Sequence, residues 1–300
     1  KGILGLSKIG IKDNFFERGG HSLRATALVS TIQKELQKNI QLRDVFSHPT
    51  IEQLAQLIEN IEQTAYSVIP NIEEQPYYPV SSAQKRLYIL SQLAGGEISY
   101  NMPNAMLLDG EIDRERIEKT FQQLIARHEI LRTSFELVGG EPIQRVHKEV
   151  PFALEYVQVT NEEEAEGIIR DFTRMFDLQS APLLRVGLIQ LAYDRHVSLF
   201  DMHHIISDGT SMNVLIQEFA SLYHGEVLPI QRIQYKDYAS WQQQQMKSEW
   251  YQQQENYWLQ VFSKELPVLQ LPTDLTRPAI RSFDGGLLEF RIGKHTSEDL

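Results

Sequence analysis

The sequence predicts a small all-α domain followed by a larger α/β domain. Apolar residues recur at helical spacing within residues 1–61, whereas helical and strand patterns alternate from residue 76 onward. Between them, the segment 62–75 (EQTAYSVIPNIEEQ) loses helical periodicity and contains a proline, as connectors between domains do. The length of 300 residues also indicates about two domains.

In the first domain, one helix is expected to begin near Ser22 and another to follow Pro49, a residue suited to a first helical turn. The apolar positions are Ala25, Leu28, Ile32 and Leu36 in the first helix and Ile51, Leu54, Ala55, Ile58 and Ile61 in the second. Because each set lies on one helical face, the helices are expected to pack into one compact block.

The second domain is expected to alternate helices and strands. In order, the pattern predicts a helix at SAQKRLYILSQL, a strand at NAMLLDGEI that ends at Asp109-Gly110, a helix from about Asp113 to Arg127, a strand at LRTSFEL, a turn at Gly139-Gly140 and a strand at PIQRVH. The glutamine-rich stretch WQQQQMKSEWYQQQ is expected to be a helix packed on one side, because large apolar residues interleave and follow its glutamines: Trp241, Met246, Trp250, Tyr251, Tyr257 and Trp258.

Composition excludes several classes of function. The formal net charge of -11 argues against a nucleic-acid surface, which needs clustered Lys and Arg to neutralise phosphates. The sequence has no long uncharged apolar run for a membrane span, and KGILGLSKIG lacks the apolar core of a signal peptide. The absence of cysteine excludes disulfides and thiol nucleophiles. We expect a soluble cytoplasmic protein without nucleic-acid or membrane partners.

The stretch MHHIISDGTS, from Met202 to Ser211, has the layout of an acyl-transfer site. The preceding HVSLF reads as a buried strand, and Ser211 can cap a following helix that His224-Gly225 closes. Because adjacent strand residues point to opposite faces, His203 and His204 cannot both serve one centre, and one of them is expected to be structural. The same geometry disfavours a metal centre formed with Asp208, so we expect no metal.

Asp208-Gly209 has the composition of a tight turn. Glycine there is expected to supply a backbone geometry that most residues resist and to leave space beside the histidine. Asp208 is expected to act as a support for the site.

The string DNFFERGGHSL, residues 13–23, resembles the peptidyl carrier (thiolation) domains of non-ribosomal peptide synthetases. The resemblance implies that Ser22 carries covalent 4'-phosphopantetheine, attached by a phosphopantetheinyl transferase. The start of a helix suits a phosphodiester, and Gly19 and Gly20 are expected to leave the serine accessible. The alternative for Ser22 is a plain helix N-cap. The resemblance also implies a helical bundle whose first helix begins before Lys1.

From about Tyr77 the sequence resembles the condensation domains of the same synthetases. Four separated stretches carry this resemblance: SSAQKRLYIL, RHEILRTSF, MHHIISDGTS and YKDYASWQ. It implies the two-lobed α/β fold shared with chloramphenicol acetyltransferase. We expect the carrier domain at 1–61, the linker at 62–75, the first lobe at 76–265 and the start of a second lobe, most of which is absent from the chain, at 266–300.

The resemblance assigns His204 to the reaction centre, as general base or as the residue that positions the incoming amine. It places His203, Asp208 and Gly209 in the same catalytic motif. It further implies that Asp208 forms an ion pair with Arg86, which would support the catalytic loop. Arg127, His128 and Arg132 fall in a family motif of mainly structural use.

The implied function is peptide-bond formation in antibiotic biosynthesis. A donor thioester on Ser22 is joined to an amine on a downstream carrier, and the implied partners are an upstream adenylation domain and downstream adenylation and carrier domains. ISYNMP and HHIISDG favour an L-configured donor. The alternatives are epimerisation of the tethered residue, heterocyclisation, which the intact histidines disfavour, and a non-catalytic carrier-recruitment platform.

Overall fold

The computed structural model describes residues 2–61, 69–93, 98–276, 286, 288 and 290–299. The chain divides into two compact units, Lys1–Val68 and Ile69–Leu300. The division falls within the segment 62–75, of which residues 62–68 lie outside the described residues. Among the described residues, no helix combines the length and the hydropathy that crossing a membrane requires.

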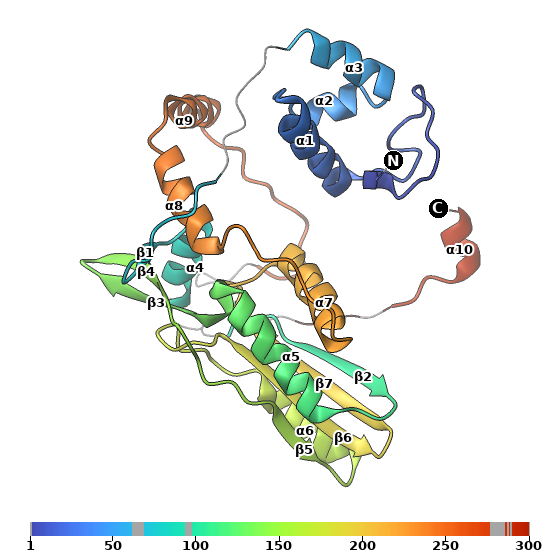
Figure 1. Ribbon diagram of the computed structural model, residues 1–300, viewed down its shortest axis with the longest axis vertical. Coiled ribbons are helices and arrows are strands. Elements are labelled where there is room, and N and C mark those ends of the chain that lie inside the picture. The colour runs from blue at the N-terminus through green and yellow to red at the C-terminus, as the bar shows by residue number, and fades with distance from the viewer. Residues whose placement is uncertain are drawn as a thin grey trace. The chain divides into compact units, whose positions relative to one another are not determined.

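The regular structure described in the first unit is helical (Figure 1). Its helices are η1 (Gly2–Leu4), α1 (Ser22–Leu36), α2 (Leu42–Ser47) and α3 (Ile51–Glu59), and its buried core is Leu4, Phe15, Ala25, Ile40, Val45 and Leu54. The two expected helices are confirmed, while α2 is too short to show a helical repeat. Thr50 caps α3 by accepting a hydrogen bond from the Gln53 amide at 3.2 Å. Pro49 therefore precedes the cap. The expectation that it occupies the first helical turn was wrong.

The two glycines before α1 are required by the packing of their loop. Gly19 has φ +86°, in the left-handed region that favours glycine. A Cβ atom on Gly20 would lie 2.3 Å from the Phe15 ring and 2.5 Å from the Phe15 carbonyl oxygen. Gly20 also donates its amide to that carbonyl at 2.9 Å. The loop is thus closed over buried Phe15, and this packing accounts for both glycines without reference to Ser22.

The second unit is built on two sheets (Figure 1). Its strands are β1 (Tyr78–Pro79), β2 (Asn104–Asp109), β3 (Thr133–Val138), β4 (Glu141–Val146), β5 (Glu155–Gln158), β6 (Leu184–Ala192) and β7 (Arg195–Met202). Its helices are α4 (Ser82–Ser91), α5 (Arg114–Arg127), η2 (Glu129–Arg132), α6 (Glu162–Phe172), α7 (Gly209–Tyr223), α8 (Tyr235–Gln245), α9 (Glu249–Val261) and α10 (Lys294–Asp299). The smaller sheet has the order β1-β4-β3, and the larger has the order β2-β7-β6-β5.

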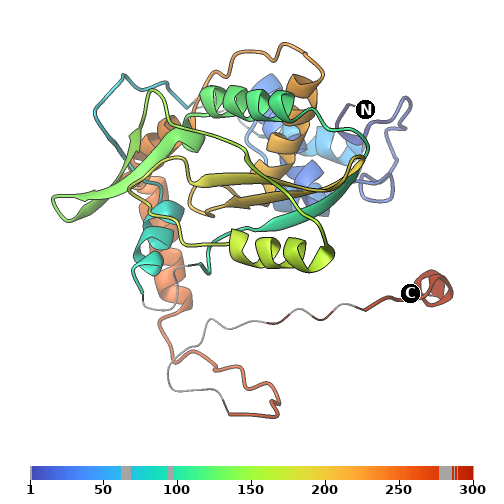
Figure 2. The same ribbon diagram turned by 90° about the horizontal axis from the view of Figure 1, so that it is seen from below.

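The larger sheet carries helices on both faces, with α5 on one side and α6 on the other (Figure 2). Strand β5 is parallel to β6 and is connected to it through α6, whereas the other pairs in this sheet are antiparallel. Side chains of β7 alternate between the two cores: Met202 packs in the core with α5, and Leu199 in the core with α6. The expected mixture of helices and strands is confirmed, including the hairpin at Gly139-Gly140, where both glycines have positive φ.

The glutamine-rich stretch differs from expectation. It forms two helices: α8 ends at Gln245, with Met246 as its C-cap, and Ser248 caps α9 by accepting a hydrogen bond from the Tyr251 amide at 3.3 Å. On α9, Trp250, Tyr257 and Trp258 are 64%, 57% and 52% exposed. The prediction of one helix with a buried aromatic face was therefore wrong. The expected start of a second lobe near GGLLEFRIGKH falls partly outside the described residues and stays a prediction.

Candidate active site

The two adjacent histidines follow the last residue of β7 and face opposite ways. His203 is 2% exposed, and its ring lies against Tyr100 and Phe176. Its Nδ1 accepts the Ile205 amide at 3.1 Å. His204 is exposed and lines a cleft. This is the outcome that strand alternation predicts, with one histidine in the interior and the other available to a ligand.

The orientation of His204 is fixed by one side-chain contact and one backbone contact. Its Nδ1 lies 2.6 Å from the carbonyl oxygen of Ser207. Because a carbonyl can only accept, the proton of a neutral ring is on Nδ1, and Nε2 carries the lone pair. Its backbone amide donates to the Tyr100 carbonyl at 2.7 Å. Nε2 has no hydrogen-bond partner among the described residues, so it is free to accept a proton from a molecule in the cleft.

Burial sets the charge state of His203. Desolvation, with a smaller contribution from nearby His204, lowers the pKa of His203 from 6.5 to about 4. A neutral ring also matches its contact, since Nδ1 needs its lone pair to accept the Ile205 amide. His203 is therefore neutral at physiological pH and supports the loop from inside.

Acid is expected to destabilise the second unit through His203. The pKa of His203 is lower in the folded protein than in the unfolded chain. Its neutral ring therefore contributes fully to the free energy of unfolding above about pH 6.5, and this contribution of about 3 kcal/mol is lost as pH falls toward 4. The difference in unfolding free energy between wild type and His203→Asn, measured with urea, is therefore expected to shrink by that amount from pH 7 to pH 4. His224→Asn changes an exposed histidine and serves as the control. A pH-independent difference for His203→Asn would contradict the assignment.

The cleft beside His204 has a volume of about 620 Å³. Residues from several elements of the second unit line it. They are Ala83, Gln84, Arg86, Leu87 and Leu90 of α4; Tyr100; His128, Ile130 and Leu131; Met202 and His204 to Asp208; Thr210, Ser211, Val214 and Leu215 of α7; and Tyr235 of α8. The structure thus brings Arg86 to the same cleft as His204 and Asp208, which lie more than 100 residues further along the sequence.

Asp208 is the N-cap of α7. Its Oδ1 accepts hydrogen bonds from the Ser211 amide at 2.8 Å and from the Ser211 hydroxyl at 2.7 Å. These bonds, which outweigh partial burial, hold the pKa of the Asp208 carboxyl below its usual value. The expectation that Ser211 caps this helix was wrong: Ser211 is the donor, and Asp208 is the cap. Asp208 therefore joins the histidine loop to the helix.

The expected ion pair between Asp208 and Arg86 is not formed between these two described residues. Arg86 is exposed on the cleft wall, and both bonds from Ser211 are accepted by Oδ1 of Asp208. The support from α4 comes instead from Gln84, which is 1% exposed and donates to the Ile205 carbonyl at 3.4 Å. Gln84 also forms a capping box with Ser81, and the spacing of these two residues could have identified it from the sequence.

Gly209 is the first residue of α7 and does not have positive φ. A Cβ atom at this position would meet nothing within 4 Å. The expected need for a backbone geometry that other residues resist was therefore wrong. The second part of the expectation, that glycine leaves space beside the histidine, stays a prediction, because a Cβ atom at this position would not approach the histidine loop either.

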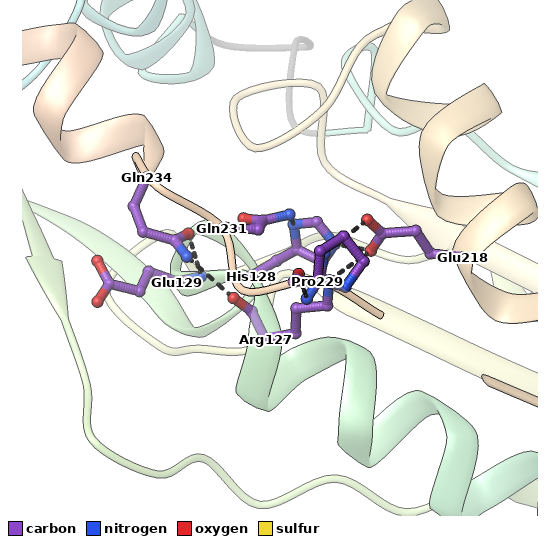
Figure 3. Close-up of polar contacts among 7 residues, drawn as sticks. All are labelled: Arg127, His128, Glu129, Glu218, Pro229, Gln231 and Gln234. Carbon is purple, nitrogen blue, oxygen red and sulfur yellow. Dashed lines mark hydrogen bonds and ion pairs between the residues drawn. The ribbon is translucent and has the colours of Figure 1, made fainter. Parts of the chain in front are cut away.

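A hydrogen-bonded cluster at the end of α5 surrounds His128, its one member that lines the cleft among the described residues (Figure 3). Glu218 of α7 accepts two bonds from Arg127, at 2.9 and 3.2 Å, and lies 2.6 Å from His128 Nε2. Burial would raise the pKa of Glu218, but the bonds from Arg127 and His128 hold it below its usual value. Gln234 of the segment before α8 accepts from the Glu129 amide. The cluster ties α5, α7 and this segment together.

His128 is a second histidine that lines the cleft, in a motif for which the family resemblance implies a mainly structural use. The Gln231 amide nitrogen lies 3.2 Å from its Nδ1, and Glu218 lies on its Nε2. With the Gln231 amide as donor, Nδ1 accepts and Nε2–H donates to Glu218. Both ring nitrogens are then engaged. His128 is consequently a fixed part of the wall, and His204 has the only uncommitted imidazole nitrogen among the described residues that line this cleft.

Ser22 is the first residue of α1 and is exposed. The N-cap position belongs to His21, whose side chain makes no cap hydrogen bond. The alternative role of Ser22 as a plain N-cap is therefore wrong. Its hydroxyl makes no hydrogen bond among the described residues, while the first amides of α1 are free of helical partners. A free hydroxyl beside helix-terminal amides fits the attachment of a phosphodiester.

No cluster of metal-ligating side chains occurs in the described part of the chain.

Two family profiles match the chain. The condensation domain profile covers residues 74–300, and the phosphopantetheine attachment site profile covers residues 1–58. Gramicidin S synthase 2 of Aneurinibacillus migulanus is 51% identical over the whole chain, which spans 7% of that protein. Tyrocidine synthase 3 of Brevibacillus parabrevis is 50% identical over 99% of the chain, which spans 5% of that protein.

Two solved structures share the fold of the second unit. The complex of the X-domain and OxyB from teicoplanin biosynthesis is 26% identical, with a TM-score of 0.65, and the match covers 73% of this chain and 50% of that one. The condensation domain from the Monacolin K polyketide synthase MokA is 23% identical, with a TM-score of 0.57, over 70% of this chain and 46% of that one. The chain thus spans about half of these domains.

Proposed function

Since the chain belongs to the carrier and condensation domain families of non-ribosomal peptide synthetases, we propose that it forms amide bonds in the assembly of a peptide antibiotic. The first unit holds an aminoacyl or peptidyl donor, and the second unit transfers that donor to the amine of an acceptor on a downstream carrier. The observation that carries this proposal is the state of His204. Its ring is oriented by Ser207, and its free Nε2 belongs to a residue that lines the cleft.

We propose Ser22 as the attachment point of 4'-phosphopantetheine, whose thiol holds the donor as a thioester. The exposed hydroxyl, the unclaimed amides at the start of α1 and the match to the attachment-site profile support this residue. Gly19 and Gly20 keep the preceding loop closed over Phe15. The loop therefore presents Ser22 at a fixed helix end.

In the cleft, His204 accepts the proton that the acceptor amine loses as its nitrogen attacks the donor carbonyl. As the new C–N bond forms, the C–S bond of the donor thioester breaks, and the sulfur leaves as a thiol that takes up the proton. An imidazole suits this step because its ordinary pKa lies near neutrality. His203, Asp208 and Gly209 contribute differently: His203 supports the loop from the interior, Asp208 joins it to α7, and Gly209 leaves space at the helix start. The walls orient the two reactants, which by itself supplies part of the acceleration.

The proposed partners are a phosphopantetheinyl transferase, an upstream adenylation domain that supplies the donor, and downstream adenylation and carrier domains that supply the acceptor. The much greater length of the gramicidin and tyrocidine synthases supports partners in the same assembly. We propose the cytoplasm as the place of synthesis.

The direct test is a transfer assay in a protein that contains this chain and a complete condensation domain. With a peptidyl pantetheine on Ser22 and an aminoacyl acceptor carrier, mass spectrometry is expected to find the elongated thioester on the acceptor. An acceptor with an acetylated amine is the control and should gain nothing. Absence of elongation with both substrates loaded would reject amide formation. If the donor residue appeared in the product with its α-carbon configuration inverted, the result would favour epimerisation coupled to transfer.

A docking platform without chemistry is the second candidate, because the X-domain from teicoplanin biosynthesis, which shares this fold, was solved in complex with OxyB. The oriented, uncommitted His204 imidazole favours the catalytic function over this candidate. The transfer assay separates the two, since a platform binds loaded carriers but yields no elongated product.

A further inference from the structure

The backbone of His204 is held by the short segment that leads into β2. The His204 amide donates to the Tyr100 carbonyl at 2.7 Å, and the next residue, Asn101, forms an isolated antiparallel bridge with His203. This segment therefore continues the antiparallel pairing of β2 with β7 beyond the first residue of β2 and the last residue of β7. Its position along β7 determines where the His204 main chain lies.

The side chain of Asn101 anchors that segment to a buried charged cluster. Its Nδ2 donates to Asp201 Oδ2 at 2.8 Å and to the Arg174 carbonyl at 3.0 Å. Asp201 is fully buried and forms an ion pair with Arg185 at 3.1 Å, across the β6–β7 ladder. Arg185 also donates to the carbonyls of Arg174 and Met175, each at 2.7 Å. Asn101 is thus tied to a rigid point inside the sheet.

No other side chain in residues 98–103 makes a hydrogen bond to a described residue. Ile98 and Ser99 are exposed, and Tyr100 is half-buried on the cleft. Without the Asn101 amide, the segment would keep its backbone bonds and the packing of Tyr100 and Met102 against the core, but it would have no side-chain hydrogen bond to a described residue at the point where regular pairing ends.

We propose that Asn101 is a positioning residue for His204 in the amide-forming reaction. By holding the Tyr100 carbonyl in place, it fixes the backbone amide of His204, while the Ser207 carbonyl fixes the ring. This inference rests on the proposed function of the cleft. A shift of about 1 Å in a catalytic group can cost about 100-fold in rate, so a loosened segment affects turnover before it affects binding.

Replacement of Asn101 by alanine tests this role at the cost of the hydrogen bond that it donates to the buried Asp201 carboxylate. Asp201 keeps Arg185 as a partner, and the Arg174 carbonyl keeps its bond from the same guanidinium. The substitution also removes Asn101 Oδ1, a buried atom that has no partner among the described residues. The matched control is Asn104→Ala, because Asn104 is exposed on the adjoining strand and its side chain makes no hydrogen bond to a described residue.

In a protein that contains this chain and a complete condensation domain, Asn101→Ala is expected to lower kcat for transfer about 10- to 100-fold. KM for the acceptor carrier and the melting temperature are expected to stay close to wild type, and Asn104→Ala to leave all three unchanged. In the His204→Ala background, Asn101→Ala should cause no further loss, because both changes act through one group. If Asn101→Ala lowered kcat by the same factor in wild type and in the His204→Ala background, the proposal would be overturned.

A second measurement does not depend on turnover. The imidazole resonances of His204, observed by NMR, are expected to shift in Asn101→Ala and to remain in place in Asn104→Ala. Unshifted resonances together with wild-type kcat would reject the positioning role even if the cleft forms amide bonds. If wild type forms no product but the resonances shift only in Asn101→Ala, the proposed function fails while the positioning contact stands.

Discussion

Replacement of Ser22 by alanine is expected to abolish loading of the chain. With coenzyme A and a promiscuous phosphopantetheinyl transferase, wild type should gain the mass of one phosphopantetheinyl group, and Ser22→Ala should gain none. The physical reason is that the modification needs a free hydroxyl at the helix start, and Ser22 supplies one that takes no part in capping α1. Because alanine is a good helix former, α1 itself should be unaffected.

Ser30→Ala is the matched control for this experiment. Ser30 is an exposed serine on the same helix, and its side chain makes no hydrogen bond to a described residue. It should load as wild type does. Equal circular dichroism for the two variants and wild type would show that folding is not the cause of the difference. A mass gain in Ser22→Ala, or the absence of one in wild type, would reject the assignment.

Replacement of His204 by alanine is expected to lower the rate of elongation about 10²- to 10⁴-fold, the usual contribution of a positioned proton acceptor. The expected loss follows from the lone pair on Nε2, for which no other imidazole lining the cleft can substitute: both ring nitrogens of His128 are engaged. Single-turnover transfer from loaded Ser22 to an aminoacyl carrier, quantified by mass spectrometry in a protein with a complete condensation domain, measures the effect.

His224→Ala provides the comparison, since His224 is exposed at the C-terminal end of α7, does not line the cleft, and its ring contacts the carbonyl of Ala220 and the ring of Tyr223. It is expected to retain nearly full activity. If His204→Ala elongated the donor as fast as wild type, orientation of the reactants would account for the reaction and the proton-accepting role would be wrong.

The periodicity of the sequence was sufficient to predict those parts of the site that depend on the geometry of a single strand or helix. The alternation of β7 predicts that His203 and His204 face opposite sides, and the burial of one and exposure of the other agree with it. The start of α1 at Ser22 follows from the spacing of its apolar residues. The mixed helical and strand architecture of the second unit was predicted for the same reason.

The contacts between distant segments could not be predicted in this way. Gln84 reaches the Ile205 carbonyl across 121 residues of sequence, and His128 reaches Glu218 across 90. The expected partner of Asp208, Arg86, lies on the same cleft, yet the serine three residues further along satisfies the carboxylate first. Sequence pattern identifies which residues are capable of a contact, while the packed helices decide which contact is made.

The hairpin of β6 and β7 restricts how this domain can change during evolution. Inserting or deleting one residue between Arg195 and Met202 would exchange the faces of the two histidines, turning the reactive ring inward and bringing the inert one out. The ladder already accommodates an irregularity between Gln190 and Ala192, at the end remote from the reaction centre. Homologous chains of different length should therefore gain or lose residues near that end, whereas the final stretch before the paired rings should differ only by point replacement.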